Sequence, residues 1–121
     1  MGIRLFIYGT LKRGQVKHHL LAGQRFLGPA VTVARFRLLD LGWYPGLAET
    51  AENGVSVEGE VWEISHTCLE QLDAYEGSAY VRQKIELERA PEAAQGGPVE
   101  AYVLKEPDWT RPDAGSVWLR G

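Results

Sequence analysis

The chain has 121 residues, of which 45% are hydrophobic and 24% are charged, and its formal net charge at pH 7 is −3. This length suits one globular domain, and we expect a single domain over residues 1–121 with an irregular tail from about residue 106. Charges of both signs are mixed and form no basic block, which argues against a nucleic-acid partner. No apolar run is long enough to span a membrane, so a membrane role is not expected.

Short runs of β-branched and aromatic residues in the first half of the chain are typical of strands. In chain order the predicted strands are residues 3–8, 26–35, 36–41 and 55–64. A helical turn over residues 18–22 and a Pro–Gly turn over residues 43–46 are expected between them. In the fourth strand Gly59 interrupts the apolar face, which indicates either a bulge or a close approach of another backbone.

The clearest helix follows Thr67, which is a good N-cap residue with Glu70 three positions later as a capping-box partner. Cys68, Leu72 and Tyr75 recur at helical spacing and predict one apolar face. Gly77 is suited to end the helix in a left-handed conformation.

Two more strands are predicted in the second half of the chain, over residues 80–88 and 99–104. The first alternates strongly, with Val81, Ile85 and Leu87 on the face expected to be buried. Many short strands with one good helix indicate the α+β class, with the domain built around a barrel-like sheet.

Several kinds of reactive site are missing from the sequence. There is no phosphate-binding Gly-rich loop with a lysine and no nucleophile elbow. His18, His19 and His66 lack the spacing of a metal site, so we predict no metal, and we place His18 and His19 in a loop or on a helix surface.

Cys68 is expected to be a buried, inert thiol, although a position near a helix N-terminus leaves reactivity open. As the only cysteine it forms no internal disulfide, and with no signal peptide at the N-terminus we expect a cytoplasmic protein.

The first candidate site is the end of the first strand, where Tyr8, Gly9, Thr10 and Leu11 lead into a polar loop. Backbone N–H groups at such a strand end can hold a carboxylate or a developing oxyanion. The alternative is an ordinary turn between a strand and a loop.

The second candidate is Glu76 in the last turn of the predicted helix. It follows Leu72 by four residues and therefore shares the face that points toward the core. Burial and the negative end of the helix dipole both raise the pKa of a carboxyl group, which favours proton transfer near neutral pH. The alternative is a solvated side chain at a frayed helix end. Asp73 falls on another face and is expected to be solvated.

These two segments resemble the signatures of one known family. Residues 6–15 (Phe-Ile-Tyr-Gly-Thr-Leu-Lys-Arg-Gly-Gln) are similar to the N-terminal signature of the γ-glutamylcyclotransferase-like superfamily, closest to γ-glutamylamine cyclotransferases and their small bacterial relatives. Residues 72–77 resemble the second signature, which carries the catalytic glutamate. Residues 44–46, 57–62 and 80–82 resemble three further family motifs in the expected order. Many relatives have Asn in the loop that corresponds to residues 16–19, and this chain has none.

The resemblance implies a single-domain small mixed β-barrel with flanking helices, one pocket, and neither a metal nor an organic cofactor. It further implies that the backbone of Tyr8 to Leu11 holds the glutamyl end of a small γ-glutamyl substrate, with Tyr80 as a hydrogen-bond donor in the pocket wall. Glu76 would then act as general base and acid while the γ-glutamyl group cyclises to 5-oxoproline and the attached amine is released.

Two other functions are consistent with the sequence. One is a non-catalytic protein of the same fold that binds a small amino-acid-like ligand. Such a protein would gain little from a carboxylate whose surroundings disfavour its negative charge. Trp109 and Trp118 in the tail suggest a protein-interaction module, although tail aromatics more often cover their own core. The sequence gives no prediction of the oligomeric state.

Overall fold

A computed structural model describes residues 2–15 and 17–119; Val16, in the loop without the family's Asn, lies outside the described residues. Its strands, in chain order, are β1 (Ile3–Ile7), β2 (Arg25–Thr32), β3 (Phe36–Asp40), β4 (Pro45–Glu49), β5 (Glu58–Ile64), β6 (Tyr80–Ile85), β7 (Leu87–Arg89) and β8 (Val99–Leu104). The helices are α1 (His66–Glu76) and two short 3-10 helices, η1 (His18–Leu21) and η2 (Glu92–Ala94).

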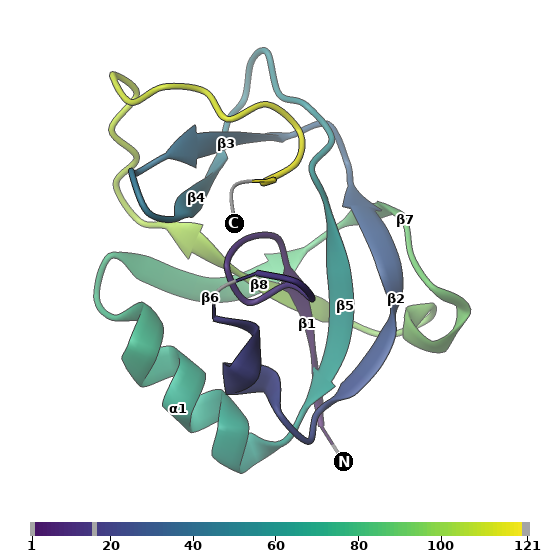
Figure 1. Cartoon of the computed structure of the whole chain (residues 1–121). Helices are drawn as coiled ribbons and strands as arrows, with labels where there is room; N and C mark the ends of the chain where they lie inside the picture. Colours follow the sequence, from purple (N-terminus) through teal and green to yellow (C-terminus); the bar gives the residue numbers. More distant parts are fainter. Residues whose placement is uncertain (1, 16, 120–121) are drawn as a thin grey trace.

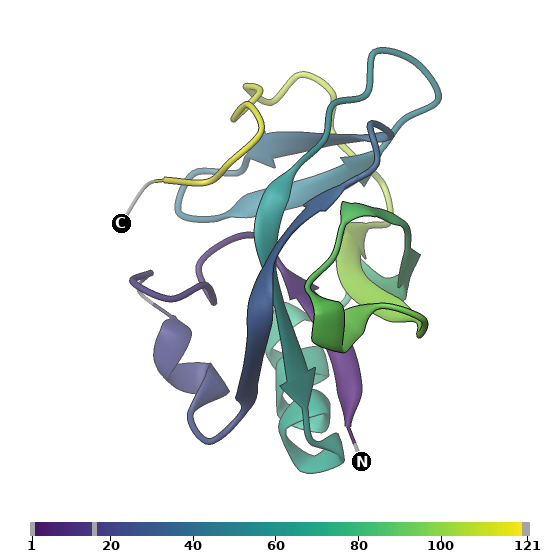
Figure 2. The same cartoon turned by 90° about the vertical axis from the view of Figure 1, so that its right-hand side faces the viewer.

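The strands form one mixed sheet that curls into a half-barrel, with α1 lying along one side (Figure 1). Its order is β3-β4-β8-β1-β5-β2-β7, and β6 pairs with β8 outside this path. β5 runs antiparallel to both β1 and β2, whereas β8 makes parallel contacts with β1 and β4. Figure 2 shows the long strands β2 and β5 crossing in front of α1. The predicted α+β class is confirmed.

Side chains of β1 alternate between two hydrophobic clusters, one on each face of the sheet, because successive residues of a strand point to opposite faces. Phe6 and Tyr8 belong to the cluster inside the half-barrel. Leu5 and Ile7 belong to the cluster between the sheet and α1. The end of β1 is therefore fixed from both sides, which determines where the chain leaves the sheet at Gly9.

The helix begins two residues earlier than predicted. Ser65, not Thr67, is the N-cap residue: its backbone is extended, and its side chain accepts a hydrogen bond from the N–H of Cys68 over 3.2 Å. Serine is as good a cap as threonine, so residue type alone did not distinguish the two positions. Gly77 ends the helix with a positive φ of 76°, and its N–H donates to the carbonyl oxygen of Asp73.

Several strand boundaries differ from the prediction. The Pro–Gly pair at residues 45–46 was placed in a turn but opens β4, while the turn itself joins residues 41 and 44 through a backbone hydrogen bond. Proline is tolerated as the first residue of a strand, so it did not exclude one here. The predicted strand 80–88 is two strands: β6 pairs with β8, and β7 pairs with β2. Val81, predicted to be buried, is 40% exposed, and its neighbour Tyr80 is buried instead.

Gly59 of β5 lies where another backbone comes very close. A Cβ atom at this position would be 2.4 Å from the carbonyl oxygen of Ile7 and 2.6 Å from the ring of Phe6. The predicted close approach is confirmed. The register shift near this point lies in β2, between Phe26 and Gly28, and not in β5.

The tail after β8 contains neither helix nor strand in its described part, yet it is tied to the sheet. Backbone hydrogen bonds join Asp40 to Pro112, Ala114 to Leu38 and Glu58 to Ser116. The side chain of Trp118 is 3% exposed and belongs to the inner cluster, whereas Trp109 is 54% exposed. The tail thus closes one end of the half-barrel, beside the β3–β4 hairpin (Figures 1 and 2).

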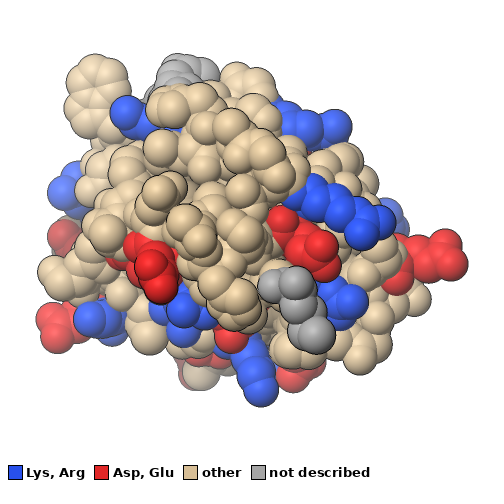
Figure 3. All heavy atoms as spheres, turned by 90° about the horizontal axis from the view of Figure 1, so that it is seen from below, with Lys and Arg blue, Asp and Glu red and all other residues tan. Residues whose placement is uncertain are grey.

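On the face seen in Figure 3, lysine, arginine and acidic side chains are interspersed around a broad uncharged centre. In the described part of the chain, no helix combines the length and the hydropathy needed to cross a bilayer.

Candidate functional site

A pocket of about 270 Å³ opens where the end of β1, the β3–β4 turn, the last turn of α1 and the strands β6 and β8 meet. The six residues that the sequence singled out all line it: Tyr8, Gly9, Thr10, Leu11, Glu76 and Tyr80. The other lining residues are Phe6, Ile7, Tyr44, Pro45, Tyr75, Ala79 and Tyr102. The two segments that carry the family resemblance therefore line one cavity, in which Leu11 and Glu76 are 65 positions apart in the sequence.

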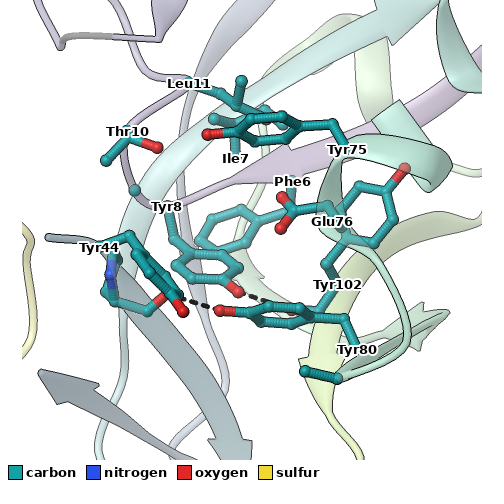
Figure 4. A pocket seen from close by; sticks show the side chains of 13 residues that line it. Phe6, Ile7, Tyr8, Thr10, Leu11, Tyr44, Tyr75, Glu76, Tyr80 and Tyr102 are labelled. Carbon is teal, nitrogen blue, oxygen red and sulfur yellow. Dashed lines mark hydrogen bonds between the residues drawn. The ribbon is translucent and has the colours of Figure 1, made fainter. Parts of the chain in front are cut away.

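Glu76 is the one charged residue among the described residues that line the pocket. Its carboxylate is turned into the cavity beside the ring of Phe6 (Figure 4), and none of the described residues donates a hydrogen bond to it. Burial among aromatic rings disfavours the anion and raises the pKa of Glu76 from 4.5 to about 7. The side chain is thus divided between its acid and its carboxylate near neutral pH, in contrast to the solvated alternative.

Two of the tyrosines that line the pocket donate their hydroxyl hydrogens to backbone carbonyl oxygens of its wall. Tyr8 donates to the carbonyl oxygen of Tyr102 over 2.7 Å and accepts from the N–H of Leu47. Tyr80 donates to the carbonyl oxygen of Pro45 over 3.1 Å. Burial raises the pKa of both hydroxyls, so both stay neutral. Tyr80 lines the pocket. Its hydroxyl hydrogen is donated to the backbone of the pocket wall, and a hydrogen bond from Tyr80 to a substrate stays a prediction.

The strand end at Gly9 forms a tight turn in which the N–H of Lys12 donates to the carbonyl oxygen of Gly9 over 3.1 Å. Within the described residues, the N–H groups of Gly9, Thr10 and Leu11 have no acceptor. Consecutive free N–H groups of this kind form a concave site for an anion. A Cβ atom at Gly9 would lie 2.7 Å from the ring of Pro45, so glycine is what allows the two walls to approach.

Asp73 is exposed, as expected, and it is also an acceptor in a hydrogen-bond network beside the pocket. Arg82 donates to its two carboxylate oxygens over 3.0 and 3.1 Å, and the hydroxyl of Tyr102 donates over 2.6 Å. Arg82 also bonds Glu100 of the neighbouring strand. The Arg82 hydrogen bonds hold the pKa of Asp73 below its usual value. The network fixes the last turn of α1, and with it Glu76, against β6 and β8.

Some pocket residues were not identified as site residues from the sequence. Tyr44 and Pro45 lie inside one of the motifs that resemble the family, and Tyr75 precedes Glu76, so a signal was present for these three. Tyr75 was expected on the buried face of the helix but is 46% exposed, with its hydroxyl toward Thr10 (Figure 4). Tyr102 had no local signal, because it reaches the pocket only through the pairing of β8 with β6.

The lining of the pocket includes neither Cys68 nor any of the three histidines. His18 is half-buried, with its Nδ1 atom 3.0 Å from the carbonyl oxygen of Leu11 and its ring against Trp62, so it is not the surface residue expected. Burial raises the pKa of the Cys68 thiol, which disfavours the reactive thiolate. Across residues 2–15 and 17–119, no three His, Cys, Asp or Glu side chains are grouped so that they could hold a metal ion.

Comparison with known proteins gives concordant matches. The model of the family described as gamma-glutamyl cyclotransferase, AIG2-like, matches residues 5–120. A putative gamma-glutamylcyclotransferase of Drosophila melanogaster is 43% identical over 83 residues, which are 63% of this chain and 53% of that protein. Gamma-glutamylaminecyclotransferase of Rattus norvegicus is 33% identical over 87% of this chain and 81% of its own length.

Among solved structures, the crystal structure of an AIG2-like protein from Mus musculus superposes with a TM-score of 0.81 at 29% identity. The superposition covers 95% of this chain and 87% of the mouse chain. The match to the fly relative, by contrast, spans only about half of that protein's length.

Proposed function

The chain belongs to the gamma-glutamyl cyclotransferase, AIG2-like family, and from that premise we propose that it converts the γ-glutamyl group of a small amide into 5-oxoproline and releases the attached amine. The observation that carries this proposal is the position of Glu76. This carboxyl group, with a pKa of about 7, lines the same pocket as the Gly9 turn, whose N–H groups have no acceptor among the described residues. The identity of the amine is left to experiment.

The substrate's glutamyl end requires partners for negative charge. The described pocket lining contains no arginine or lysine, and the N–H groups of Gly9, Thr10 and Leu11 have no acceptor among the described residues, so we take these N–H groups as the donors. We assign to this turn the oxygen of the γ-carbonyl, which becomes an oxyanion when the ring closes. Loss of one such donor typically costs about 10²–10³ in rate.

The attacking group in this reaction is already part of the substrate. The α-amino nitrogen of the glutamyl group bonds to its own γ-carbonyl carbon, the carbon–nitrogen bond to the departing amine breaks, and a five-membered lactam remains. The task of the pocket is to hold the substrate's glutamyl group in the folded conformer in which the amino nitrogen lies next to the γ-carbonyl carbon. The rigid tyrosine walls suit that task, because the hydroxyls of Tyr8 and Tyr80 are fixed to the backbone.

Glu76 is the group that moves the proton. As a carboxylate it accepts a proton from the attacking α-amino nitrogen, and as a carboxylic acid it returns that proton to the departing nitrogen. A pKa of about 7 makes both forms available at neutral pH, which is the condition for one residue to serve as base and then as acid. No nucleophilic side chain is required from the protein.

The test is to incubate the purified protein with a panel of γ-glutamyl amines and γ-glutamyl amino acids and to measure 5-oxoproline. We expect release from at least one member, and loss of about 10²–10⁴ in rate for Glu76→Gln. Glu70→Gln, an exposed site on the same helix, is the matched control and should retain activity. A panel member that raises the melting temperature but yields no product would instead support the non-catalytic binding protein.

A further inference from the structure

Lys12 is a buried cation that the proposed reaction does not use. It is only 8% exposed, although it is the last residue of the Gly9 turn and leads into a polar loop. Its Nζ atom donates a hydrogen bond to the carbonyl oxygen of Trp118 over 2.8 Å. Removing an ammonium group from water is costly unless its partners are well placed, so this location calls for an explanation.

The partner of Lys12 is itself firmly held. The segment before Trp118 makes backbone hydrogen bonds to Asp40, Leu38 and Glu58, and the indole of Trp118 is packed in the inner cluster with Tyr8. The tail end and the loop of residues 9–15 also lie side by side in both cartoon views (Figures 1 and 2). The carbonyl oxygen of Trp118 is therefore a fixed point behind the pocket wall.

At the other end of the Lys12–Trp118 hydrogen bond, Lys12 belongs to the Gly9 turn, which carries the free N–H groups. Lys12 is the last residue of this turn, and its own N–H closes it onto the carbonyl oxygen of Gly9. The carboxylate of Glu60 fixes the next residue, Arg13, through its backbone N–H over 3.1 Å and its side chain over 3.3 Å. The loop is thus anchored immediately after the N–H groups of Thr10 and Leu11.

We propose that Lys12 and Trp118 form a positioning pair, in which the C-terminal tail holds the Gly9 turn in the shape that binds negative charge. This inference rests on the proposed function for its kinetic consequence. Its structural consequence, an ordered turn, can be measured without any substrate. Neither residue touches the substrate; both act through the N–H groups of Thr10 and Leu11.

The first experiment compares Lys12→Met with Lys12→Arg, and with Lys17→Met as the control from the exposed part of the same loop. Amide hydrogen exchange, followed by NMR without ligand, reports on the turn. We expect faster exchange at the amide of residue 12 in Lys12→Met, because the turn opens more often, with unchanged protection in β5. Lys12→Arg should restore protection in part, and Lys17→Met should match the wild type. Unchanged exchange in Lys12→Met would overturn the pairing.

Kinetics provide the second readout. In Lys12→Met we expect kcat to fall by about tenfold to a hundredfold, because misplaced donors stabilise the oxyanion poorly. The ionisation seen in the pH–rate profile should stay in place, since Glu76 lies on the opposite wall. A methionine also avoids burying a charge, so the melting temperature should change little; a loss of activity that merely followed a loss of folded protein would refute the positioning role.

A double-mutant cycle tests the partner. A chain that ends at Val117 lacks the Trp118 carbonyl, whereas a chain that ends at Leu119 retains it and should behave as the wild type. If the pair acts as a unit, Lys12→Met causes little further loss in the shorter chain. Multiplicative losses would show independent effects and contradict the pairing. If the wild type releases no 5-oxoproline from any substrate, the proposed function fails. The pairing of Lys12 with Trp118 is then tested by hydrogen exchange alone.

Discussion

The hydroxyl group of Tyr80, at the start of β6, donates a hydrogen bond to the carbonyl oxygen of Pro45, the first residue of β4. β6 and β4 are not paired with each other, since both pair with β8. The hydrogen bond therefore joins two walls of the pocket across the strand that separates them. Pro45 in turn contacts the position of Gly9, so this bond also sets the width available to the turn.

We predict that Tyr80→Phe lowers stability by about 1 kcal/mol, the usual net value of one hydrogen bond. Because the hydroxyl hydrogen is committed to Pro45, kcat should fall less than tenfold. The measurements are urea unfolding and initial rates of 5-oxoproline release. A decrease of a hundredfold or more in kcat, with stability unchanged, would mean that Tyr80 does donate to the substrate.

The pH dependence of kcat/KM should report the ionisation of Glu76 in the free enzyme. The carboxylate is the form that accepts a proton, so the rate should fall about tenfold per pH unit below a midpoint near 7. A free glutamate side chain would place that midpoint between pH 4 and 5. A profile that remains flat down to pH 5 would contradict the raised pKa of Glu76.

The same pKa predicts how stability changes with pH. Between about pH 4.5 and about pH 7 the folded protein keeps a proton on Glu76 that the unfolded chain has lost, so stability falls as pH rises through this interval. The full shift corresponds to roughly 3 kcal/mol at most. The decline should be measured relative to Glu76→Gln, which has no such group. A stability difference that stays constant over this interval would be inconsistent with the prediction.

Two glycines of the N-terminal loop should respond differently to the same substitution. In Gly9→Ala the new methyl group meets the ring of Pro45 at 2.7 Å, so the turn must shift, and we expect at least a tenfold loss of kcat/KM.

Gly14→Ala is the matched control for that substitution. Its φ of +82° costs about 1 kcal/mol in stability for a residue with a side chain, but nothing lies within 4 Å of the new atom. Activity should be retained. Circular dichroism melts and steady-state kinetics of both variants separate the two effects, and equal activity losses would show that crowding at Pro45 is not the cause.

Local sequence patterns predicted much of the fold. The helix ending at Gly77, the strand at residues 99–104 and the close approach at Gly59 follow from residue types and spacing, which act over a few positions. The errors share a cause. Ser65 and Thr67 are equivalent caps by type, and the Pro–Gly pair at residues 45–46 suits a turn as well as a strand start, so only packing decided between them.

The sequence by itself predicted the candidate site residues: a glutamate at the end of an amphipathic helix, and the Tyr-Gly-Thr-Leu segment that follows the first strand. Tertiary structure decided what surrounds them. In the folded protein the hydroxyl groups of Tyr8 and Tyr80 donate to backbone carbonyl oxygens, and Lys12 donates to the carbonyl oxygen of Trp118. Tyr102 of β8 also lines the pocket. These contacts depend on the order of strands in the sheet, which brings together residues about 35 to 106 positions apart. Local sequence patterns extend over only a few positions, so they contain no information about contacts at such separations.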